Sequence, residues 1–308
     1  MRCMTVGEIN VDVVLSGMSA LPELGQEVLC ERVETVMGSA SCIFACRMAG
    51  LGEESAICGL VGEDQHARVC LESLTAAGVD TSRVVRDPAV STGATYIMSL
   101  PEDRAMVTHL GAIAQLTLSH VPEGLFDGVD HLHVTSPFLQ LGLRPDLPDL
   151  MRRARAAGAT VSFDAQWDPE EKWADTPELA ALADVLLPNE VEARRMTGER
   201  DLDRALERLL EWGAGCVVIK AGDQGAMAGR GAERACHPAF PITPVDTTGA
   251  GDTFDAAFVK AFLADRLNLE DSLAFACAAG GLSCLQIGGI GEPLSSERVR
   301  AYIQEAQR

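Results

Sequence analysis

Short apolar runs alternate with longer amphipathic segments along most of the chain. The short runs predict strands at residues 3–7, 55–61, 131–135, 160–164, 185–187 and 216–220. The longer segments carry apolar residues at helical spacing and predict helices at 40–49, 67–77, 147–157, 190–196, 202–212, 250–264, 270–286 and 296–306. Strands that alternate with helices are typical of a mostly parallel sheet covered by helices, so we expect an α/β fold.

Two stretches do not fit this alternation. Residues 11–36 and 91–109 have the pattern of short β-hairpins. We interpret them as a small β-sheet that projects from the main domain as a lid, although ordinary edge strands would give the same pattern. Because no repeat, low-complexity tract or long linker is present, we expect one domain over residues 1–308 with the two lid segments inserted.

The chain is strongly acidic, and this limits the classes of partner that it can bind. It has 308 residues, of which 25 are Lys or Arg and 45 are Asp or Glu, for a formal net charge of −20. Nucleic-acid binding depends on basic residues that neutralise phosphates, so we expect no nucleic-acid partner. The negative net charge does not exclude a nucleotide ligand, because backbone amides and a metal ion can bind polyphosphate without net positive charge on the protein.

The cysteines and the amino terminus point to a reducing compartment. Ten cysteines occur without a C-x-x-C pair, and several lie in apolar runs, as expected of small buried side chains. The start of the chain lacks the apolar region of a signal peptide. No apolar run approaches the ~20 residues that span a bilayer. We therefore expect a cytoplasmic protein with no membrane partner.

The string DTTGAGDTF, residues 246–254, is the strongest chemical feature. Phe254, Phe258 and Phe262 recur after it at helical spacing, so a helix should begin near Gly249. The first N–H groups of a helix lack intrahelical partners and attract anions. The amides of Gly249, Ala250 and Gly251 would then form an anion hole for a transferring phosphoryl group, with Asp252 placed as a base. The alternative is a glycine-rich turn whose aspartate caps a helix.

This string resembles the carboxy-terminal motif of the ribokinase-like (PfkB) carbohydrate kinases, and the resemblance covers nearly the whole chain. It implies a Rossmann-like, doubly wound, mostly parallel sheet with a small β-sheet lid, which in the family often serves as a dimer interface. It also implies ATP-dependent phosphorylation of a sugar hydroxyl. A homodimer through the lid is a further expectation.

The early motifs carry the resemblance on the substrate side. GEINVD at residues 7–12 is similar to the family's first strand, which implies that Asn10 and Asp12 hold sugar hydroxyls. Gly38 and Ser39 fall where the family has a Gly-Gly turn, and Ile43 replaces a family asparagine. Because one hydroxyl-binding amide is missing, the sequence does not name the sugar.

Basic residues are sparse in these early segments. Arg104, on the second hairpin, is the exception. We therefore predict an unphosphorylated sugar or sugar-like alcohol as the acceptor.

Three later motifs resemble the family's ATP site. LPNEVE at residues 187–192 is similar to its N-x-x-E motif and assigns Asn189 and Glu192 to the nucleotide, with Mg²⁺ bound by Glu192 through water. The alternative there is a helix cap with an acidic first turn. Strand 216–220 leads into KAGDQGA, where Lys220, Gly222 and Gly225 match a nucleotide loop whose usual first residue is threonine. ACAAGG at residues 276–281 resembles the family's small-residue helix that flanks the adenine pocket, which implies that Cys277 lies beside it.

The remaining expectations concern a second cation and the rival functions. The family often binds K⁺, which here would lie near Asp246 and Thr248.

The segment 164–168 replaces the family's Asp-Pro-Asn stretch, and we expect Trp167 to pack in a wall of the site. His131 and His133 alternate in an apolar strand and are expected to be packed. The alternatives are a nucleoside kinase of the same fold and an inactive sugar- or nucleotide-binding regulatory protein.

Overall fold

The computed structural model describes residues 1–100 and 104–306. Within these ranges the main sheet has nine strands in the order β13-β12-β11-β10-β9-β8-β1-β4-β5. The strands are β1 (Arg2–Val6), β4 (Glu54–Val61), β5 (Asp80–Arg86), β8 (His131–Thr135), β9 (Thr160–Asp164), β10 (Val185–Leu186), β11 (Val217–Lys220), β12 (Ala226–Arg230) and β13 (Glu233–His237). Neighbours from β5 to β11 run parallel, and β12 and β13 add an antiparallel hairpin at one edge. The predicted α/β fold is confirmed.

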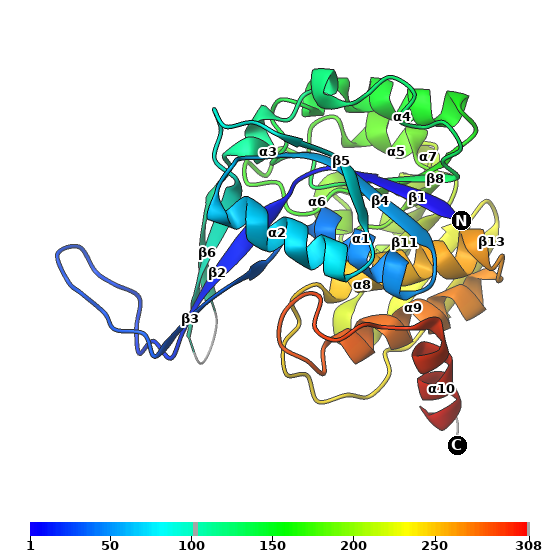
Figure 1. Ribbon diagram of the computed structural model, residues 1–308. Coiled ribbons are helices and arrows are strands. Elements are labelled where there is room, and N and C mark those ends of the chain that lie inside the picture. The colour runs from blue at the N-terminus through cyan, green and yellow to red at the C-terminus, as the bar shows by residue number, and fades with distance from the viewer. Residues whose placement is uncertain (101–103, 307–308) are drawn as a thin grey trace.

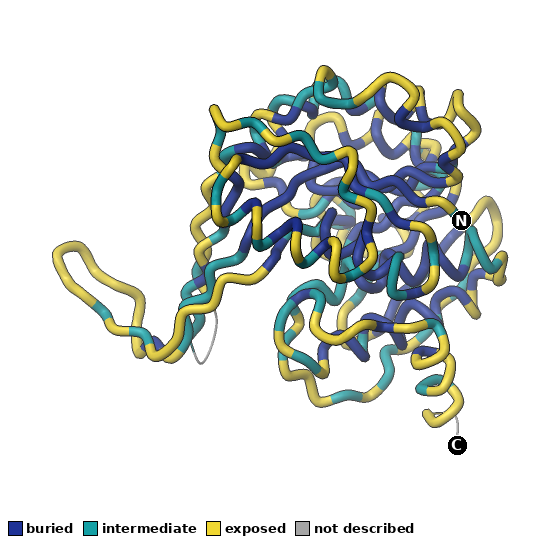
Figure 2. The backbone as a smooth tube through the Cα atoms, viewed as in Figure 1, coloured by how far each residue is buried: buried dark blue, intermediate teal, exposed yellow. Residues whose placement is uncertain are grey.

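Helices cover both faces of this sheet, as Figure 1 shows. One face packs against α4 (Leu147–Ala156), α5 (Thr176–Leu182), α6 (Glu190–Thr197) and α7 (Leu202–Glu211). The other packs against α1 (Ala40–Gly50), α8 (Ala250–Val259) and α9 (Leu269–Ser283), with α10 (Ser296–Ala306) against α9. Successive strand residues alternate between the two cores, as Val217 and Val218 do. Central strands such as β1 and β8 are therefore buried on both faces, as Figure 2 shows.

The predicted strands agree with the structure to within a residue, but β5, β12 and β13 were missed. β5 has the sequence DTSRVVR at a sheet edge, where one side is exposed and apolar alternation is weak. β12 and β13 form a hairpin around Gly231, with only five residues in each strand. Their side chains give no clear strand pattern, and the two segments are identified as strands by their backbone pairing.

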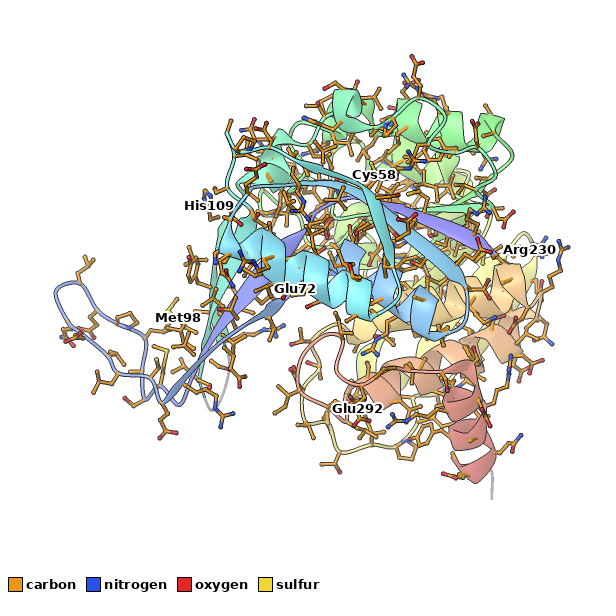
Figure 3. All side chains as sticks on the ribbon, in the orientation of Figure 1. Cys58, Glu72, Met98, His109, Arg230 and Glu292 are labelled. Carbon is orange, nitrogen blue, oxygen red and sulfur yellow. The ribbon has the colours of Figure 1, made fainter. Side chains whose placement is uncertain are left out.

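A second sheet, with the order β3-β2-β6-β7, projects from the main domain. It consists of β2 (Asn10–Ser16), β3 (Arg32–Met37), β6 (Gly93–Ser99) and β7 (Arg104–His109). The two predicted hairpins are both present, and β2 joins them by pairing parallel to β6. Residues 101–103 of the second predicted segment lie outside the described residues. Figure 2 shows that much of this lid sheet is exposed, and in Figure 3 Met98 labels its strand β6.

The helices also match their predictions closely, and two shorter ones were missed. Helix α2 (Gln65–Ala76) begins two residues earlier than expected, because Asp64 caps it by accepting a hydrogen bond from the Ala67 amide. The predicted helix at 250–264 is α8 followed by a π-turn at Lys260–Ala264. The missed helices are α3 (Ala112–Gln115) and α5. Among the described residues, no helix has the length and apolar character needed to cross a membrane.

Candidate active site

Helix α8 begins where the sequence predicted, directly after a left-handed Gly249. The φ of Gly249 is 72°, and a Cβ there would lie 2.8 Å from the carbonyl oxygen of Gly289. Glycine is therefore needed both for backbone conformation and for space. The Ala250 amide donates to the Thr247 carbonyl at 3.2 Å, so one of the three predicted anion-hole amides has an internal partner. Gly251 faces open space, since a Cβ on it would meet only the Lys220 ammonium, at 3.8 Å.

Asp252 lies in the first turn of α8, beside the carboxyl end of β9. The side-chain amide of Gln166 donates to Asp252 Oδ1 at 3.0 Å. Burial raises the pKa of Asp252 to about 6, and the nearby Asp164 carboxylate adds to this, while Lys220 and the Gln166 hydrogen bond oppose it. A carboxylate with this pKa is ionised at neutral pH and is more basic than an ordinary aspartate, as a general base requires.

A buried cluster of charges lies beneath Asp252. The Lys220 ammonium donates to Asp164 Oδ2 at 3.0 Å and to both carboxylate oxygens of Asp255 at 2.9 Å. Burial alone would lower the pKa of Lys220, but the carboxylates of Asp164, Asp255 and Glu192 outweigh it and hold the ammonium protonated. Asp255 follows Asp252 by three residues and therefore lies on the same side of α8.

A cleft of about 680 Å³ opens over the carboxyl ends of β9, β10 and β11. Its polar end is lined by Asp164, Gln166, Asn189, Glu192, Lys220, Ala250 and Gly251. Its less polar end is lined by Gly222, Gly225, Phe240, Pro241, Ile242, Cys277 and Gly280. Ligands of open α/β sheets bind at this edge, and an apolar pocket with a few convergent polar groups is typical of nucleotide sites.

Asn189 and Glu192 form a capping box at the start of α6. Asn189 Oδ1 accepts from the Glu192 amide at 2.9 Å, and Glu192 Oε2 accepts from the Asn189 amide at 2.9 Å. The helix cap that the sequence offered as an alternative role for this motif is therefore present. Both residues also line the cleft. Burial and the Asp164 charge raise the pKa of Glu192 to about 7. Asn189 pairs with Lys220 across the neighbouring strand ends, which brings two predicted nucleotide motifs together.

The loop after β11 turns on two glycines. Gly222 and Gly225 have φ values of 55° and 96°, and a Cβ on Gly225 would overlap the carbonyl oxygen of His237. The loop therefore packs directly against the chain that leads to Phe240. Cys277 approaches the same His237 carbonyl from α9. The predicted glycine loop and the predicted small-residue helix thus meet at the less polar end of the cleft.

The predicted substrate residues gather at the base of the lid, outside the lining of this cleft. Asn10 donates to Asp12 Oδ1 at 3.3 Å, and a Cβ on Gly38 would overlap the Asp12 carboxylate. Ser39 caps α1 with a φ of 70°, and its hydroxyl accepts from the Cys42 amide and donates to the Glu8 carbonyl. The Ser39 hydroxyl therefore caps α1 and ties its start to the Glu8 backbone. A glycine there would adopt this φ without strain.

Arg104 connects the lid to the start of α8. Its guanidinium donates to the Thr248 hydroxyl at 3.4 Å, from strand β7. Burial raises the pKa of Asp12 to about 6, and the Arg104 charge opposes this rise. Arg104 also lowers the pKa of Asp246. The charge of Arg104, on the lid, therefore acts on the carboxylates of both Asp12 and Asp246.

Asp246 organises the loop before α8. Its Oδ1 accepts from the Thr248 amide and hydroxyl at 2.9 and 2.7 Å, and its Oδ2 accepts from the Gly288 amide at 2.8 Å. Burial opposes ionisation, but these hydrogen bonds outweigh it and lower the pKa of Asp246. The two residues expected near K⁺ are thus hydrogen-bonded to each other, and Asp246 supplies a negative charge.

The described residues contain no group of three or more His, Cys, Asp or Glu side chains that could bind a metal ion. Mg²⁺ does not need such a cage, because it keeps several waters and binds one or two carboxylates plus substrate phosphates. A single carboxylate, Glu192, fits this mode. His131 and His133 share the Ser162 hydroxyl in the core, which confirms that they are packed.

Sequence reasoning missed several residues of the site. Asp164, Gln166 and Asp255 surround the predicted base, and Phe240 lines the cleft from a loop. Two signals were available: Asp164 ends a predicted strand at the ligand-binding edge, and Asp255 follows Asp252 at helical spacing. Trp167 is exposed over 45% of its surface and contacts Trp173 edge to face, so it packs on the surface beside the site.

Residues 2–296 match the model of the pfkB family of carbohydrate kinases. The ATP-dependent ribose-1-phosphate kinase of Halopiger xanaduensis is 30% identical, over 99% of this chain and 98% of the relative. The 2-dehydro-3-deoxygluconokinase of Bacillus subtilis is 30% identical, over 88% and 87%. A ribokinase II candidate from Escherichia coli, solved with ATP and Mg²⁺, superposes with a TM-score of 0.86 at 24% identity, over 99% of both chains, and so shares the fold.

Proposed function

Since the chain belongs to the pfkB family of carbohydrate kinases, we propose that it transfers the γ-phosphoryl group of ATP to a hydroxyl of a small unphosphorylated sugar or sugar-like alcohol. The observation that carries this proposal is the position of Asp252. It lies in the first turn of α8, next to the Gly251 amide, with a pKa raised to about 6. An anion site and a base are thereby adjacent.

In the proposed reaction Asp252 accepts the proton of the acceptor hydroxyl. The hydroxyl oxygen forms a bond to the γ-phosphorus, the bond from that phosphorus to the β,γ-bridging oxygen breaks, and ADP leaves. The helix terminus at Gly249, Ala250 and Gly251 stabilises charge on the transferring group. Because Ala250 donates to Thr247, the Gly251 amide is the better-placed donor. Phosphoryl transfer depends mainly on such positioning and charge stabilisation.

ATP would occupy the cleft, with its base at the less polar end and its phosphates toward α8. Phe240, Pro241 and Cys277 supply apolar surface for the base, and the Gly222–Gly225 turn brings backbone close to the nucleotide. Glu192 would hold Mg²⁺ through water, and the ion would neutralise charge on the phosphates. Lys220 is engaged with Asp164 and Asp255, so we assign it to shaping the site more than to direct phosphate contact.

The acceptor would bind between the lid and α8, near Asn10, Asp12 and Gly38. Asp12 and Asp246 make this region acidic, and the Arg104 charge is offset by both carboxylates. An acidic pocket repels an acceptor that already carries phosphate, which supports an unphosphorylated substrate. Ile43 lies under the loop, within 3.1 Å of the Cβ position at Gly249, and adds an apolar wall.

A sugar phosphate is a second candidate acceptor, and two observations favour it. One relative is a ribose-1-phosphate kinase at 30% identity, and Arg104 projects from the lid toward Thr248, where it could pair with a substrate phosphate. A nucleoside remains an alternative acceptor, and an inactive binding protein remains an alternative function.

An ADP-release assay with ribose, fructose, ketodeoxygluconate, adenosine and ribose 1-phosphate separates these candidates. We expect an unphosphorylated sugar to stimulate ADP release most, and Arg104→Met to change its KM by less than about threefold. Stimulation by ribose 1-phosphate alone, lost in Arg104→Met and kept in the lid control Arg32→Met, would establish the second candidate. ATP turnover that no acceptor stimulates would favour a binding protein.

A monovalent cation and a homodimer complete the proposal. K⁺ would bind beside Asp246 and Thr248, where carboxylate and hydroxyl oxygens converge. For the dimer, strand register places Val13, Tyr96 and Val107 in one row across the lid, with Leu15 and Met98 in the next row on the same face. Val107 is exposed over 60% of its surface. An apolar sheet face of this kind is suited to pairing with a second copy.

A further inference from the structure

Gln166 adopts an unusual backbone conformation beside the base. It follows β9 by two residues and has a φ of 53°, which side-chain-bearing residues rarely adopt. Its amide N–H donates to Asp164 Oδ1 at 3.2 Å, so the turn is held by the buried carboxylate that ends the strand. Such strained residues persist where surrounding contacts enforce them, and they cluster at functional sites.

The Gln166 side chain links two carboxylates that would otherwise repel each other. Its Nε2 group donates to Asp164 Oδ2 at 2.9 Å and to Asp252 Oδ1 at 3.0 Å. An amide nitrogen carries two hydrogens, so both are used. Asp164 is the last residue of β9, and Asp252 lies in the first turn of α8. The Gln166 side chain therefore fixes the start of α8 against the sheet.

The position of Asp164 is itself fixed. Lys220 donates to it at 3.0 Å and also holds Asp255, which lies one turn after Asp252 on α8. A continuous chain of contacts thus runs from the end of β11 through Asp164 and Gln166 to the base. Gln166 is the member of this chain that touches Asp252.

We propose that Gln166 is a positioning residue for the catalytic base. By binding Oδ1 of Asp252 it fixes the rotation of the carboxylate and leaves Oδ2 to accept the proton of the substrate hydroxyl. This inference rests on the proposed function, because only a phosphotransferase of this kind needs Asp252 as a base. Fixing one oxygen of a base raises the fraction of productive geometries.

The charges around Asp252 give this role a measurable consequence. Burial disfavours the ionised form of Asp252, and so does the Asp164 charge from β9. Glu192 from α6 also feels the Asp252 charge, which raises the pKa of Glu192. Lys220 from β11 and the Gln166 donor favour the ionised form. Asp255, the neighbouring carboxylate on α8, is paired with Lys220. Removing the Gln166 donor should therefore raise the pKa of Asp252.

The test compares Gln166→Leu and Gln166→Glu with the wild-type protein. Leucine keeps much of the volume without a donor, and glutamate keeps the shape but adds a third negative charge. For both variants we expect kcat to fall about tenfold or more, and the acidic limb of the kcat/KM pH profile to move to higher pH. For the uncharged Gln166→Leu variant, the Kd of ATP, measured by calorimetry, should stay within about twofold. Gln304→Leu, on exposed α10, is the control and should leave the kinetics unchanged.

The outcomes separate this inference from the proposed function. If Asp252→Asn is inactive while both Gln166 variants keep the wild-type kcat and pH profile, the positioning role is wrong and the kinase proposal stands. If Asp252→Asn keeps full activity, the proposed base is wrong and the positioning role is lost with it. Should Gln166→Leu fail to fold, the position of the acidic limb in Gln166→Glu decides alone.

Discussion

The Lys220 ammonium lies 2.9 Å from both carboxylate oxygens of Asp255 and joins the end of β11 to helix α8. The Lys220 side chain is 11% exposed and that of Asp255 only 1%, so the pair is shielded from water. Asp164 makes a third contact with the same ammonium, at 3.0 Å. Burying charges is costly, and each carboxylate here depends on Lys220 for compensation.

Lys220→Met should therefore destabilise the fold strongly. It leaves Asp164 and Asp255 buried without a cation, and breaking such a pair costs about 3–5 kcal/mol. The measurement is the free energy of unfolding in urea. Lys172→Met is the matched control, because its ion pair with Glu170 is exposed and should contribute at most about 1 kcal/mol. A loss below about 1 kcal/mol for Lys220→Met would contradict the compensation argument.

Asp252→Asn should lower kcat without loss of nucleotide binding. Asparagine keeps the shape and still accepts a hydrogen bond from Gln166, but it cannot take a proton at neutral pH. General-base catalysis contributes about 10²- to 10⁴-fold, so kcat should fall by that factor. The assay is ADP release, with ATP affinity measured separately. Asp203→Asn, on the exposed surface of α7, should behave as wild type. An undiminished kcat in Asp252→Asn would remove the base from the mechanism.

The activity of the wild-type protein should fall on the acid side of about pH 6. The pKa of Asp252 is raised to about 6, and only its ionised form accepts a proton. Below that pH, kcat/KM should drop about tenfold per pH unit, because the ionised fraction drops by that factor. Initial rates between pH 4.5 and 8 test this. An acidic limb near pH 4, where an ordinary aspartate titrates, would contradict the raised pKa of Asp252.

Glu8 should make stability depend on pH in a direction opposite to that of a paired carboxylate. Burial raises its pKa to about 7, although hydrogen bonds from Ser41 oppose the rise. In the unfolded chain its pKa is about 4.3. Between these values the folded state binds more protons, so the free energy of unfolding falls as pH rises, by up to about 1.4 kcal/mol per pH unit from this group.

Glu8→Gln should remove that contribution. Urea unfolding from pH 4.5 to 7.5 should give a curve for the variant that declines less steeply than the wild-type curve. The exposed Glu123→Gln should run parallel to wild type. Parallel curves for Glu8→Gln as well would mean that Glu8 is ionised in the fold across this range.

The lid sheet should mediate self-association. Val107 is paired with Tyr96, and both are exposed on the apolar face that also includes Val13. Val107→Glu places a charge in that face and should shift the protein from dimer to monomer, as measured by sedimentation equilibrium. Leu141→Glu, at an exposed apolar site outside the lid, should leave the oligomeric state unchanged. A wild-type protein that is monomeric at micromolar concentration would contradict the proposal.

Local features of the sequence determined much of the fold. The apolar periodicity predicted the central strands because those strands are buried on both faces, and it predicted the long helices because each buries one stripe. The Gly-Ala-Gly string fixed the start of α8, since only glycine tolerates the φ of 72° beside the Gly289 carbonyl. The pfkB resemblance rests on these same local strings. Edge strands escaped prediction because their pairing, more than their side chains, makes them strands.

What the sequence left open is the set of partners that surround the base. Gln166 and Asp252 are 86 positions apart, and Lys220 and Asp164 are 56 apart. Such pairs form only when the sheet order brings β9 and β11 to one edge and packs α8 across them. The sequence by itself therefore determined that a helix start formed by small residues and the carboxylate of Asp252 occur together. Only the tertiary structure decided the charge around that carboxylate, because burial and the distances between remote side chains arise from packing.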